Sequence, residues 1–169
     1  MKRILVLGSP GSGKTTFALE LSMVLGLPCI HLDKLFWKSG WEMRSRDEFD
    51  AMLLTELEKE NWIIDGNYSM TIGTRADYAD TAIFFDYPRL LCLYRVIKRV
   101  VTNYGKTRAD MGENCPERFD FEFLKYVWRF KYDEMPKCME KLEGKNINLI
   151  VVKNKREFKK LKKSIFYMK

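Results

Sequence analysis

The sequence lacks any apolar stretch approaching the roughly 18 residues that a membrane-spanning helix needs. After Met-Lys-Arg, only residues 4–7 are continuously apolar before Gly8 interrupts the run, which is too short for a secretory signal. These absences argue against the membrane and secreted classes. We expect a cytoplasmic protein with no membrane partner.

Cysteine and histidine patterns typical of metal sites are also missing. The cysteines, Cys29, Cys92, Cys115 and Cys138, lie far apart without a CxxC pair. This spacing argues against a zinc knuckle and against the dense disulfide framework of a small secreted domain. We expect reduced, mostly buried thiols. We interpret the single histidine, His31, as a packed strand residue rather than a metal ligand or catalytic base.

The net charge of +7 is confined to the C-terminal segment. Residues 153–169 hold eight Lys or Arg and one Glu, whereas the rest of the chain holds 22 basic and 22 acidic residues. Phe158, Leu161 and Ile165 recur in this segment at helical spacing, which predicts a helix that packs one face and solvates its lysines. Contact with nucleic acid or acidic lipid is the alternative explanation of this basic segment.

Short apolar runs alternate with helical patterns along the chain, as in βαβ units. The runs are almost continuously apolar, which predicts a parallel sheet with both faces covered by helices, that is, a three-layer α/β fold. Strands are expected at residues 4–7, 28–32, 62–64, 81–85 and 147–152. Helices are expected at residues 14–25, 46–60, 90–103, 118–142 and 155–166, with Pro136 kinking or splitting the fourth.

Residues 104–117 interrupt this alternation. They are polar, contain Gly105, Gly112 and Pro116, and show no apolar periodicity. Long loops of this kind inside a compact domain are usually functional. We therefore expect a single domain over residues 1–169, with residues 104–117 as a short lid.

Residues 8–15 match a phosphate-binding motif at every specified position. They read Gly-Ser-Pro-Gly-Ser-Gly-Lys-Thr, between an expected strand and an expected helix, which is the P-loop pattern G-x-x-x-x-G-K-[ST]. The motif predicts binding of ATP and Mg²⁺, with Lys14 on the β- and γ-phosphates and Thr15 on the metal. The expected nucleotide-binding residues are Gly8, Ser9, Pro10, Gly11, Ser12, Gly13, Lys14, Thr15 and Thr16. The fold expected is accordingly that of P-loop NTPases.

Three further segments carry a resemblance to a known group. Residues 31–37 read HLDKLFW, residues 62–68 read WIIDGNY and residues 86–89 read DYPR. Over nearly the whole chain, the sequence resembles the nucleoside-monophosphate kinase branch of P-loop proteins, and within it the adenylate-kinase-related DNA topology modulation (FlaR-type) proteins. Adenylate kinases have two arginines nine and thirteen residues after the aspartate of a similar Asp-x-Pro, and Arg95 and Arg99 stand at these places.

The resemblance implies that Arg95 and Arg99 contact ATP, although two solvated arginines on a surface helix are the alternative. Phosphoryl transfer needs positive charge around the migrating group, which arginine supplies in planar, multidentate form. We expect Arg108, in the lid with Lys106, to close over the γ-phosphate. Arg118 and Arg129 are later candidates.

Three aspartates are candidates for metal or acceptor binding. Asp65 ends an apolar run and precedes Gly66, resembling the Asp-Gly pair of adenylate kinases, so we expect it to hold a magnesium-bound water. Asp86 is its rival on the next strand, and a turn-capping role is the alternative for either. Asp33 lies at the carboxyl end of a strand, where open α/β sheets place ligands. In shikimate- and gluconate-kinase-like relatives a carboxylate near this position binds the acceptor hydroxyl, so the resemblance implies that Asp33 orients or deprotonates one, although a helix-cap or turn role fits equally well.

The pattern departs from adenylate kinases where the acceptor binds. Arginines that read the acceptor nucleotide in that family are replaced by Phe36 and Ser69. An acceptor phosphate would lose two charge-assisted contacts, so AMP is not favoured. Residues that fit an acceptor pocket or the core are Trp37, Trp41 and Tyr68, and residues that fit an anionic acceptor are Arg44, Arg46 and Arg75.

The leading hypothesis is a Mg-ATP-dependent kinase, monomeric or homodimeric, acting on an unidentified small-molecule acceptor. Its catalytic residues are expected to be Lys14, Asp33, Arg95, Arg99 and Arg108. A nucleotide-dependent regulator that touches DNA is the second hypothesis, implied by the resemblance and permitted by the basic segment, although no DNA-binding motif is visible. The third hypothesis is an NTPase without a small acceptor.

Overall fold

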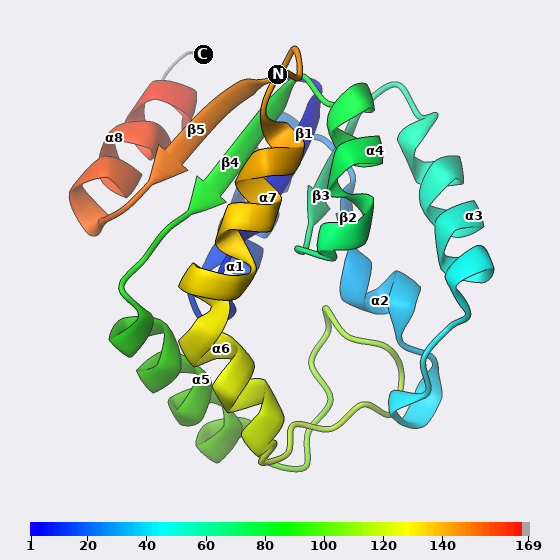
Figure 1. Cartoon of the computed structure of the whole chain (residues 1–169), viewed down its shortest axis with the longest axis vertical. Coiled ribbons are helices and arrows are strands. Elements are labelled where there is room, and N and C mark those ends of the chain that lie inside the picture. The colour runs from blue at the N-terminus through cyan, green and yellow to red at the C-terminus, as the bar shows by residue number, and fades with distance from the viewer. Residues whose placement is uncertain (167–169) are drawn as a thin grey trace.

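The structure is a computed structural model that describes residues 1–166. A five-stranded parallel sheet forms its centre (Figure 1). Its strands are β1 (Arg3–Gly8), β2 (Cys29–His31), β3 (Trp62–Asp65), β4 (Thr81–Phe85) and β5 (Asn148–Val152), arranged in the order β2-β3-β1-β4-β5. The helices are α1 (Lys14–Leu25), α2 (Leu32–Phe36), α3 (Arg46–Leu57), α4 (Ile72–Tyr78), α5 (Arg89–Asn103), α6 (Phe121–Asp133), α7 (Met135–Leu142) and α8 (Lys155–Phe166), and two 3₁₀ turns are η1 (Ser39–Trp41) and η2 (Ser69–Thr71). The expected α/β architecture is confirmed.

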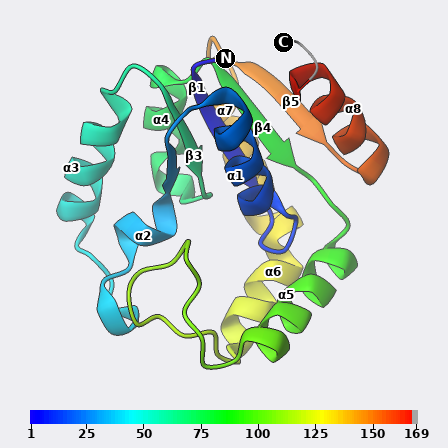
Figure 2. The ribbon, with the colours of Figure 1, turned by 180° about the vertical axis from the view of Figure 1, so that it is seen from behind.

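Both faces of the sheet are buried, which explains the continuous apolar runs. In β1, Leu5 and Leu7 belong to the core on the side of α3, α4 and α7, whereas Ile4 and Val6 belong to the core on the side of α1 and α8. All four side chains are completely buried. Figure 2 shows α1 crossing the second of these faces. A strand covered on both sides cannot alternate apolar with polar residues.

The helices and strands differ from expectation in three respects. The fourth expected helix is two helices, because α6 ends at Asp133 and Pro136 lies in the first turn of α7, where its missing N–H costs no intrahelical hydrogen bond. The expected strand at residues 28–32 ends at His31, because Leu32 begins α2. The short helices α2 and α4 were not predicted, since five and seven residues show too little periodicity.

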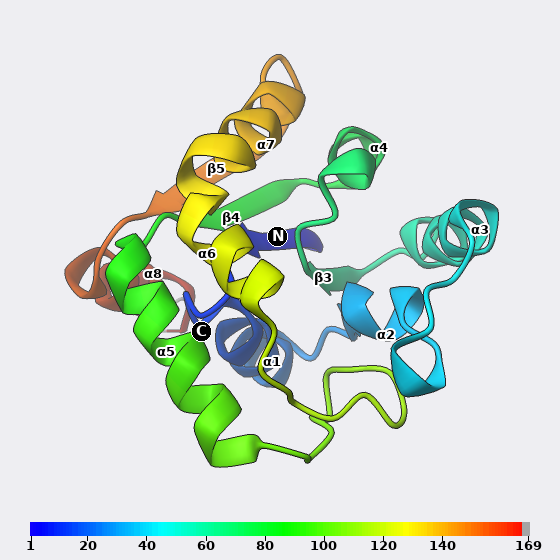
Figure 3. The ribbon, with the colours of Figure 1, turned by 60° about the horizontal axis from the view of Figure 1, so that its bottom comes forward.

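The lid segment lies against the turn that follows α2 (Figure 3). The indole Nε1 of Trp41 donates to the Pro116 carbonyl at 3.2 Å, and Asn114 Nδ2 donates to Ser39 Oγ at 3.2 Å. The Gly40 N–H lies 3.3 Å from the Glu113 carbonyl. Trp41, which we considered as a wall of the acceptor pocket or as core, instead anchors the lid.

Helix α8 carries most of the basic segment and packs as predicted. Leu161 and Ile165 are buried, Phe158 packs on the same core, and Lys162 forms an ion pair with Glu20 of α1 at 2.6 Å. Lys169, the last basic residue, lies outside the described residues. Within residues 1–166, no helix is both long and apolar enough to cross a membrane.

The contact between α1 and the sheet can be tested at Phe17. This side chain is buried, and its ring meets those of Phe85 and Phe158 edge-on at centroid distances of 5.5 and 5.4 Å. Phe17→Ala is expected to lower the free energy of unfolding by about 3–5 kcal/mol, measured by urea denaturation. Met23→Ala on the same helix, where the side chain is 77% exposed, should change it little. Equal effects of the two substitutions would contradict this packing.

Candidate active site

The phosphate-binding motif forms the loop between β1, the central strand, and α1. Gly8 has φ +135°, and a Cβ there would lie 2.5 Å from the Phe85 carbonyl oxygen of the neighbouring strand. Gly11 has φ +78°, and a Cβ there would collide with the Cys92 carbonyl of α5. Both positions therefore require glycine, because of the backbone angle and because of the close approach of another segment.

The start of α1 is suited to an anion. The helix begins at Lys14, and no side chain caps its first N–H groups, since the residue before it is Gly13. These N–H groups and the positive end of the helix dipole favour negative charge in the loop. The backbone of Gly8 is fixed by Asn67, whose side chain accepts from the Gly8 N–H at 2.9 Å and donates to the Gly8 carbonyl at 2.8 Å.

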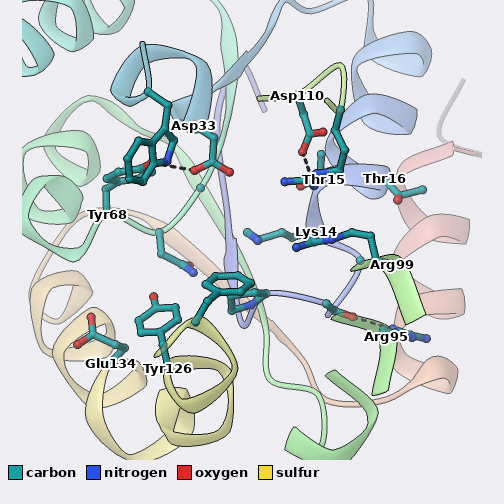
Figure 4. Close-up of a pocket in the computed structure, with 18 of the residues that line it drawn as sticks. Lys14, Thr15, Thr16, Asp33, Tyr68, Arg95, Arg99, Asp110, Tyr126 and Glu134 are labelled. Carbon is teal, nitrogen blue, oxygen red and sulfur yellow. Dashed lines mark hydrogen bonds and ion pairs between the residues drawn. The ribbon is translucent and has the colours of Figure 1, made fainter. Parts of the chain in front are cut away.

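A cavity of about 670 Å³ opens beside this loop, at the carboxyl ends of the strands (Figure 4). Open parallel sheets bind ligands at this edge. All five predicted catalytic residues line the cavity: Lys14, Asp33, Arg95, Arg99 and Arg108. Of the predicted nucleotide-binding and metal residues, Pro10, Gly11, Gly13, Lys14, Thr15 and Thr16 line it, whereas Gly8, Ser9, Ser12 and Asp65 lie behind its wall.

Arg95 is directed at the phosphate loop. Its Nη1 donates to the carbonyls of Gly11 and Ser12 at 3.4 and 3.2 Å, and its guanidinium lies 5.6 Å from the centre of the Tyr87 ring. The side chain is exposed, yet its contacts hold it at the loop. The alternative of a purely solvated surface arginine therefore does not describe Arg95.

Arg99 and Arg108 share a carboxylate that the sequence analysis missed. Glu117 Oε1 lies 3.0 Å from Arg99 Nε and 2.7 Å from Arg108 Nε, and the Glu117 side chain is only 8% exposed. Arg108 also pairs with Asp110 at 2.9 Å. Burial and the neighbouring Arg108 lower the pKa of Arg99. A buried carboxylate between them offsets the repulsion of the two guanidinium groups.

The later arginine candidates lie elsewhere. Arg118 stacks over the Trp41 ring, and Arg129 pairs with Asp133 on the outside of α6. Neither lines the cavity. Arg46 is likewise paired, with Asp50 at 2.5 Å. Of Arg46, Arg108, Arg118 and Arg129, only Arg108 lines the cavity beside the phosphate loop.

Asp33 faces the cavity from α2 rather than capping a helix. Its Oδ1 accepts from the Tyr68 hydroxyl at 2.8 Å. Burial raises the pKa of Asp33, and Lys14 and the Tyr68 hydrogen bond oppose this rise. Figure 4 shows the Asp33–Tyr68 pair on the opposite side of Lys14 from Arg99. This arrangement separates a carboxylate end of the cavity from its arginine end.

The pairing of β2 with β3 sets Asp65 beside His31, because the two residues are in register. Asp65 Oδ2 lies 3.1 Å from His31 Nδ1, and both side chains are buried. Burial alone would lower the pKa of His31, but hydrogen bonds to Asp65 and Cys29 outweigh it and raise the pKa to about 10. Asp65 Oδ1 is buried without a hydrogen-bond partner in the described part of the chain.

The rival carboxylate, Asp86, is directed away from the cavity. Its oxygens accept from Lys131 of α6 at 3.1 and 3.4 Å, and it does not line the cavity. Of the two aspartates, Asp65 is the one with an unsatisfied oxygen. The arrangement therefore favours Asp65 for a polar contact with water or an ion.

Arg75 organises the segment that leaves β3. This completely buried side chain donates to the carbonyls of Gly66, Asn67 and Tyr68 and, through Nε, to Thr71 Oγ1 at 3.0 Å. It is therefore not available to an acceptor, contrary to one of our expectations. Burial lowers the pKa of Arg75 to about 9, which leaves it charged at neutral pH. The sequence carried no signal for this role.

The end of the cavity opposite the arginines is polar and aromatic. Tyr126 of α6 and Glu134, between α6 and α7, line it, and Trp37 and Ser69 also line the cavity. Phe36, at a position where adenylate kinases have arginine, does not line it and instead packs against the rings of Trp37, Phe49 and Tyr68. The cavity thus has room for a second ligand beside the phosphate loop.

The role of Arg75 can be tested by Arg75→Met, which keeps an apolar body and leaves three carbonyls and Thr71 without their donor. Unsatisfied buried acceptors cost about 1–3 kcal/mol each, so the free energy of unfolding should fall by at least about 3 kcal/mol in urea denaturation. Arg129→Met removes an arginine whose guanidinium is on the surface and should change stability little. A stable Arg75→Met protein would show that the loop holds its shape without this side chain.

Comparisons with known proteins bear on this fold and site. A search against protein families gave no match. The chain is 26% identical over 139 residues to a cytidylate kinase of Pyrobaculum aerophilum, covering 73% of this chain and 72% of that protein. It is 24% identical over 148 residues to a cytidylate kinase of Ignicoccus hospitalis, and this match covers 79% of this chain and 83% of that protein.

Solved structures of shikimate kinases are similar in fold. The Bacteroides thetaiotaomicron enzyme superposes with a TM-score of 0.57 at 16% identity, covering 97% of this chain and 98% of that one. The Aquifex aeolicus enzyme superposes with a TM-score of 0.54 at 19% identity, and this match covers 98% of this chain and 94% of that one. Together with the parallel sheet and the phosphate loop, these likenesses show that the chain has the α/β P-loop NTPase fold.

Proposed function

We propose that this protein is a kinase that transfers the γ-phosphate of Mg-ATP to a small-molecule acceptor. The observation that carries the proposal is one cavity lined by Lys14 of the phosphate loop, three arginines and Asp33. The names of its relatives, cytidylate kinases in sequence and shikimate kinases in fold, agree with phosphoryl transfer. The acceptor class stays open between nucleosides, nucleotides and hydroxylated metabolites.

The donor half of the reaction belongs to the phosphate loop and the arginines. Lys14 and the backbone N–H groups at the start of α1 hold the polyphosphate, while Arg95, Arg99 and Arg108 surround the migrating group with positive charge. Charge of this kind, fixed before the reaction, stabilises the transition state without reorganisation. In this proposal residues 104–117 act as a lid that supplies Arg108.

The residues present fit a magnesium ion. Thr15 lines the cavity at the phosphate loop. Asp65 does not line it, but its buried Oδ1 has no hydrogen-bond partner among the described residues and is a hard oxygen suited to hold a water of the ion. Within residues 1–166 no cluster of three His, Cys, Asp or Glu could hold a metal alone. Magnesium usually keeps several waters and binds substrate phosphates, where it neutralises their developing charge.

Asp33 serves the acceptor half in this proposal. Its position beside Lys14, with a raised pKa, suits a group that accepts a proton from an acceptor hydroxyl as the phosphoryl group arrives. Tyr68 keeps its carboxylate oriented. The acceptor hydroxyl then lies at Asp33, which lines the cavity.

The two other hypotheses gain nothing from the structure. The basic helix α8 is used in packing, and no specific observation favours contact with DNA or the regulatory role of the FlaR-type group. An NTPase without an acceptor would leave unexplained the part of the cavity beyond Asp33.

The proposal is tested by measuring ADP release from Mg-ATP with a panel of nucleosides, nucleotides and hydroxylated metabolites that includes CMP and shikimate. One acceptor should raise the rate well above the rate with water alone. Lys14→Ala should lower that rate at least about 100-fold while circular dichroism and melting stay as in the wild type. No stimulation by any compound, in protein that binds ATP, would contradict the proposal.

The assignment of Asp33 is tested by Asp33→Asn, which keeps the shape and the hydrogen bond to Tyr68. Loss of a general base should lower kcat with the best acceptor about 100-fold to 10,000-fold, while the Kd for ATP is retained. Asp86→Asn removes the rival carboxylate outside the cavity and should leave kcat nearly unchanged. Similar losses in both variants would argue against a specific role of Asp33.

A further inference from the structure

A second cavity of about 620 Å³ lies between the lid and the α2–η1 segment. It adjoins the candidate active site, because Trp37 and Arg108 line both. Its walls come from the chain after β2 and from the lid, two segments that the Trp41–Pro116 contact holds together. Its basic lining residues are Lys34, Lys38, Arg44 and Arg108.

The residues that line this cavity carry a net positive charge. Four lining residues are basic, and the one acidic residue among them, Glu113, forms no ion pair within residues 1–166. Lys38 is paired with Glu48 at 3.1 Å, and Arg108 is paired with Glu117. These two cations are thus compensated by carboxylates outside the lining.

Lys34 and Arg44 have no such partner. Across the described residues, neither forms an ion pair within 4.0 Å, and Arg44 Nε is buried without a hydrogen-bond acceptor. A buried donor of a charged group costs free energy unless an acceptor satisfies it. Asp33 lines the first cavity and Lys34 and Arg44 line the second, and the two cavities meet at Trp37 and Arg108, which line both.

We propose that the second cavity binds an oxyanion, a phosphate or a carboxylate, carried by the acceptor, through Arg44 and Lys34. The inference rests on the proposed function and specifies its substrate class: an anionic hydroxyl compound with its hydroxyl at Asp33. Arg44 and Lys34 would give the acceptor positive charge at places other than Phe36 and Ser69, neither of which lines the second cavity. Guanidinium binds either oxyanion in bidentate fashion.

The lid takes part in this site. Met111 and Gly112 belong to its wall, and Gly112 lies so close to the Trp37 carbonyl that a Cβ there would collide with it. An oxyanion between Arg44 and Lys34 would therefore contact a surface that exists only while the lid lies against η1. Binding of the acceptor and docking of the lid are coupled by this geometry.

The test measures binding rather than turnover. Protein saturated with Mg-ADP, which occupies the phosphate loop, is titrated by calorimetry at constant ionic strength with inorganic phosphate, CMP and shikimate, and with cytidine as an uncharged counterpart. At least one of these anions should bind to the wild type. Its Kd should be at least about tenfold higher for Lys34→Met/Arg44→Met, since the loss of one charge-assisted contact raises Kd about tenfold or more. Lys98→Met/Arg156→Met, which removes one lysine and one arginine from the surface, should bind it as the wild type does.

The outcomes separate this inference from the proposed function. An unchanged affinity in Lys34→Met/Arg44→Met, an equal loss in the control, or no binding of any of the three anions overturns the anion site, even if phosphoryl transfer to another acceptor is found. Anion binding that depends on Arg44 and Lys34 without any phosphoryl transfer supports the site and overturns the kinase. Unchanged affinity for Mg-ADP in each variant shows that it is folded.

Discussion

The hydrogen bonds of Arg75 with the segment after β3 hold the two halves of the site in one arrangement. The guanidinium fixes the carbonyls of Gly66, Asn67 and Tyr68. From this segment, Asn67 binds both backbone groups of Gly8, and the Tyr68 hydroxyl binds Asp33. The phosphate loop and the Asp33 carboxylate are thus positioned by a single buried cation.

Burying the Arg75 guanidinium removes its charge from water, which costs free energy that its hydrogen bonds offset. Arg75 is completely buried and has no carboxylate partner among residues 1–166, so its charge is stabilised by neutral oxygens alone. Desolvation lowers its pKa to about 9, and the nearby Cys138 thiol, whose pKa burial raises to about 11, stays protonated. Several acceptors on one planar donor fix its orientation, which a flexible ammonium group would not do. The hydrogen bonds of Arg75 therefore offset the free energy of burying its charge and fix the shape of the loop.

The parts of the fold and site that depend on local sequence were predictable. The phosphate loop and the strands β1 and β4 follow from motif and apolar runs, and Asp33 could be assigned to the carboxyl edge because parallel strands end there. The roles of Arg75 and Glu117 could not be predicted. Each depends on partners brought by tertiary packing, and a single polar residue in a helix or loop has no periodicity. The short helices α2 and α4 were missed for the same lack of pattern.

The lid is attached on both sides of the cavity, and this bears on how the site works. Glu117 connects it to Arg99 of α5, whereas the indole of Trp41 connects it to the segment after α2 through the Pro116 carbonyl. Arg108, which belongs to the same segment and also pairs with Glu117, lines both cavities. Because a single guanidinium belongs to both walls, its position contributes to the shape and the charge of each cavity. Glu117 therefore orders α5, residues 104–117 and the boundary between the two cavities together, in the way that Arg75 orders the segment after β3.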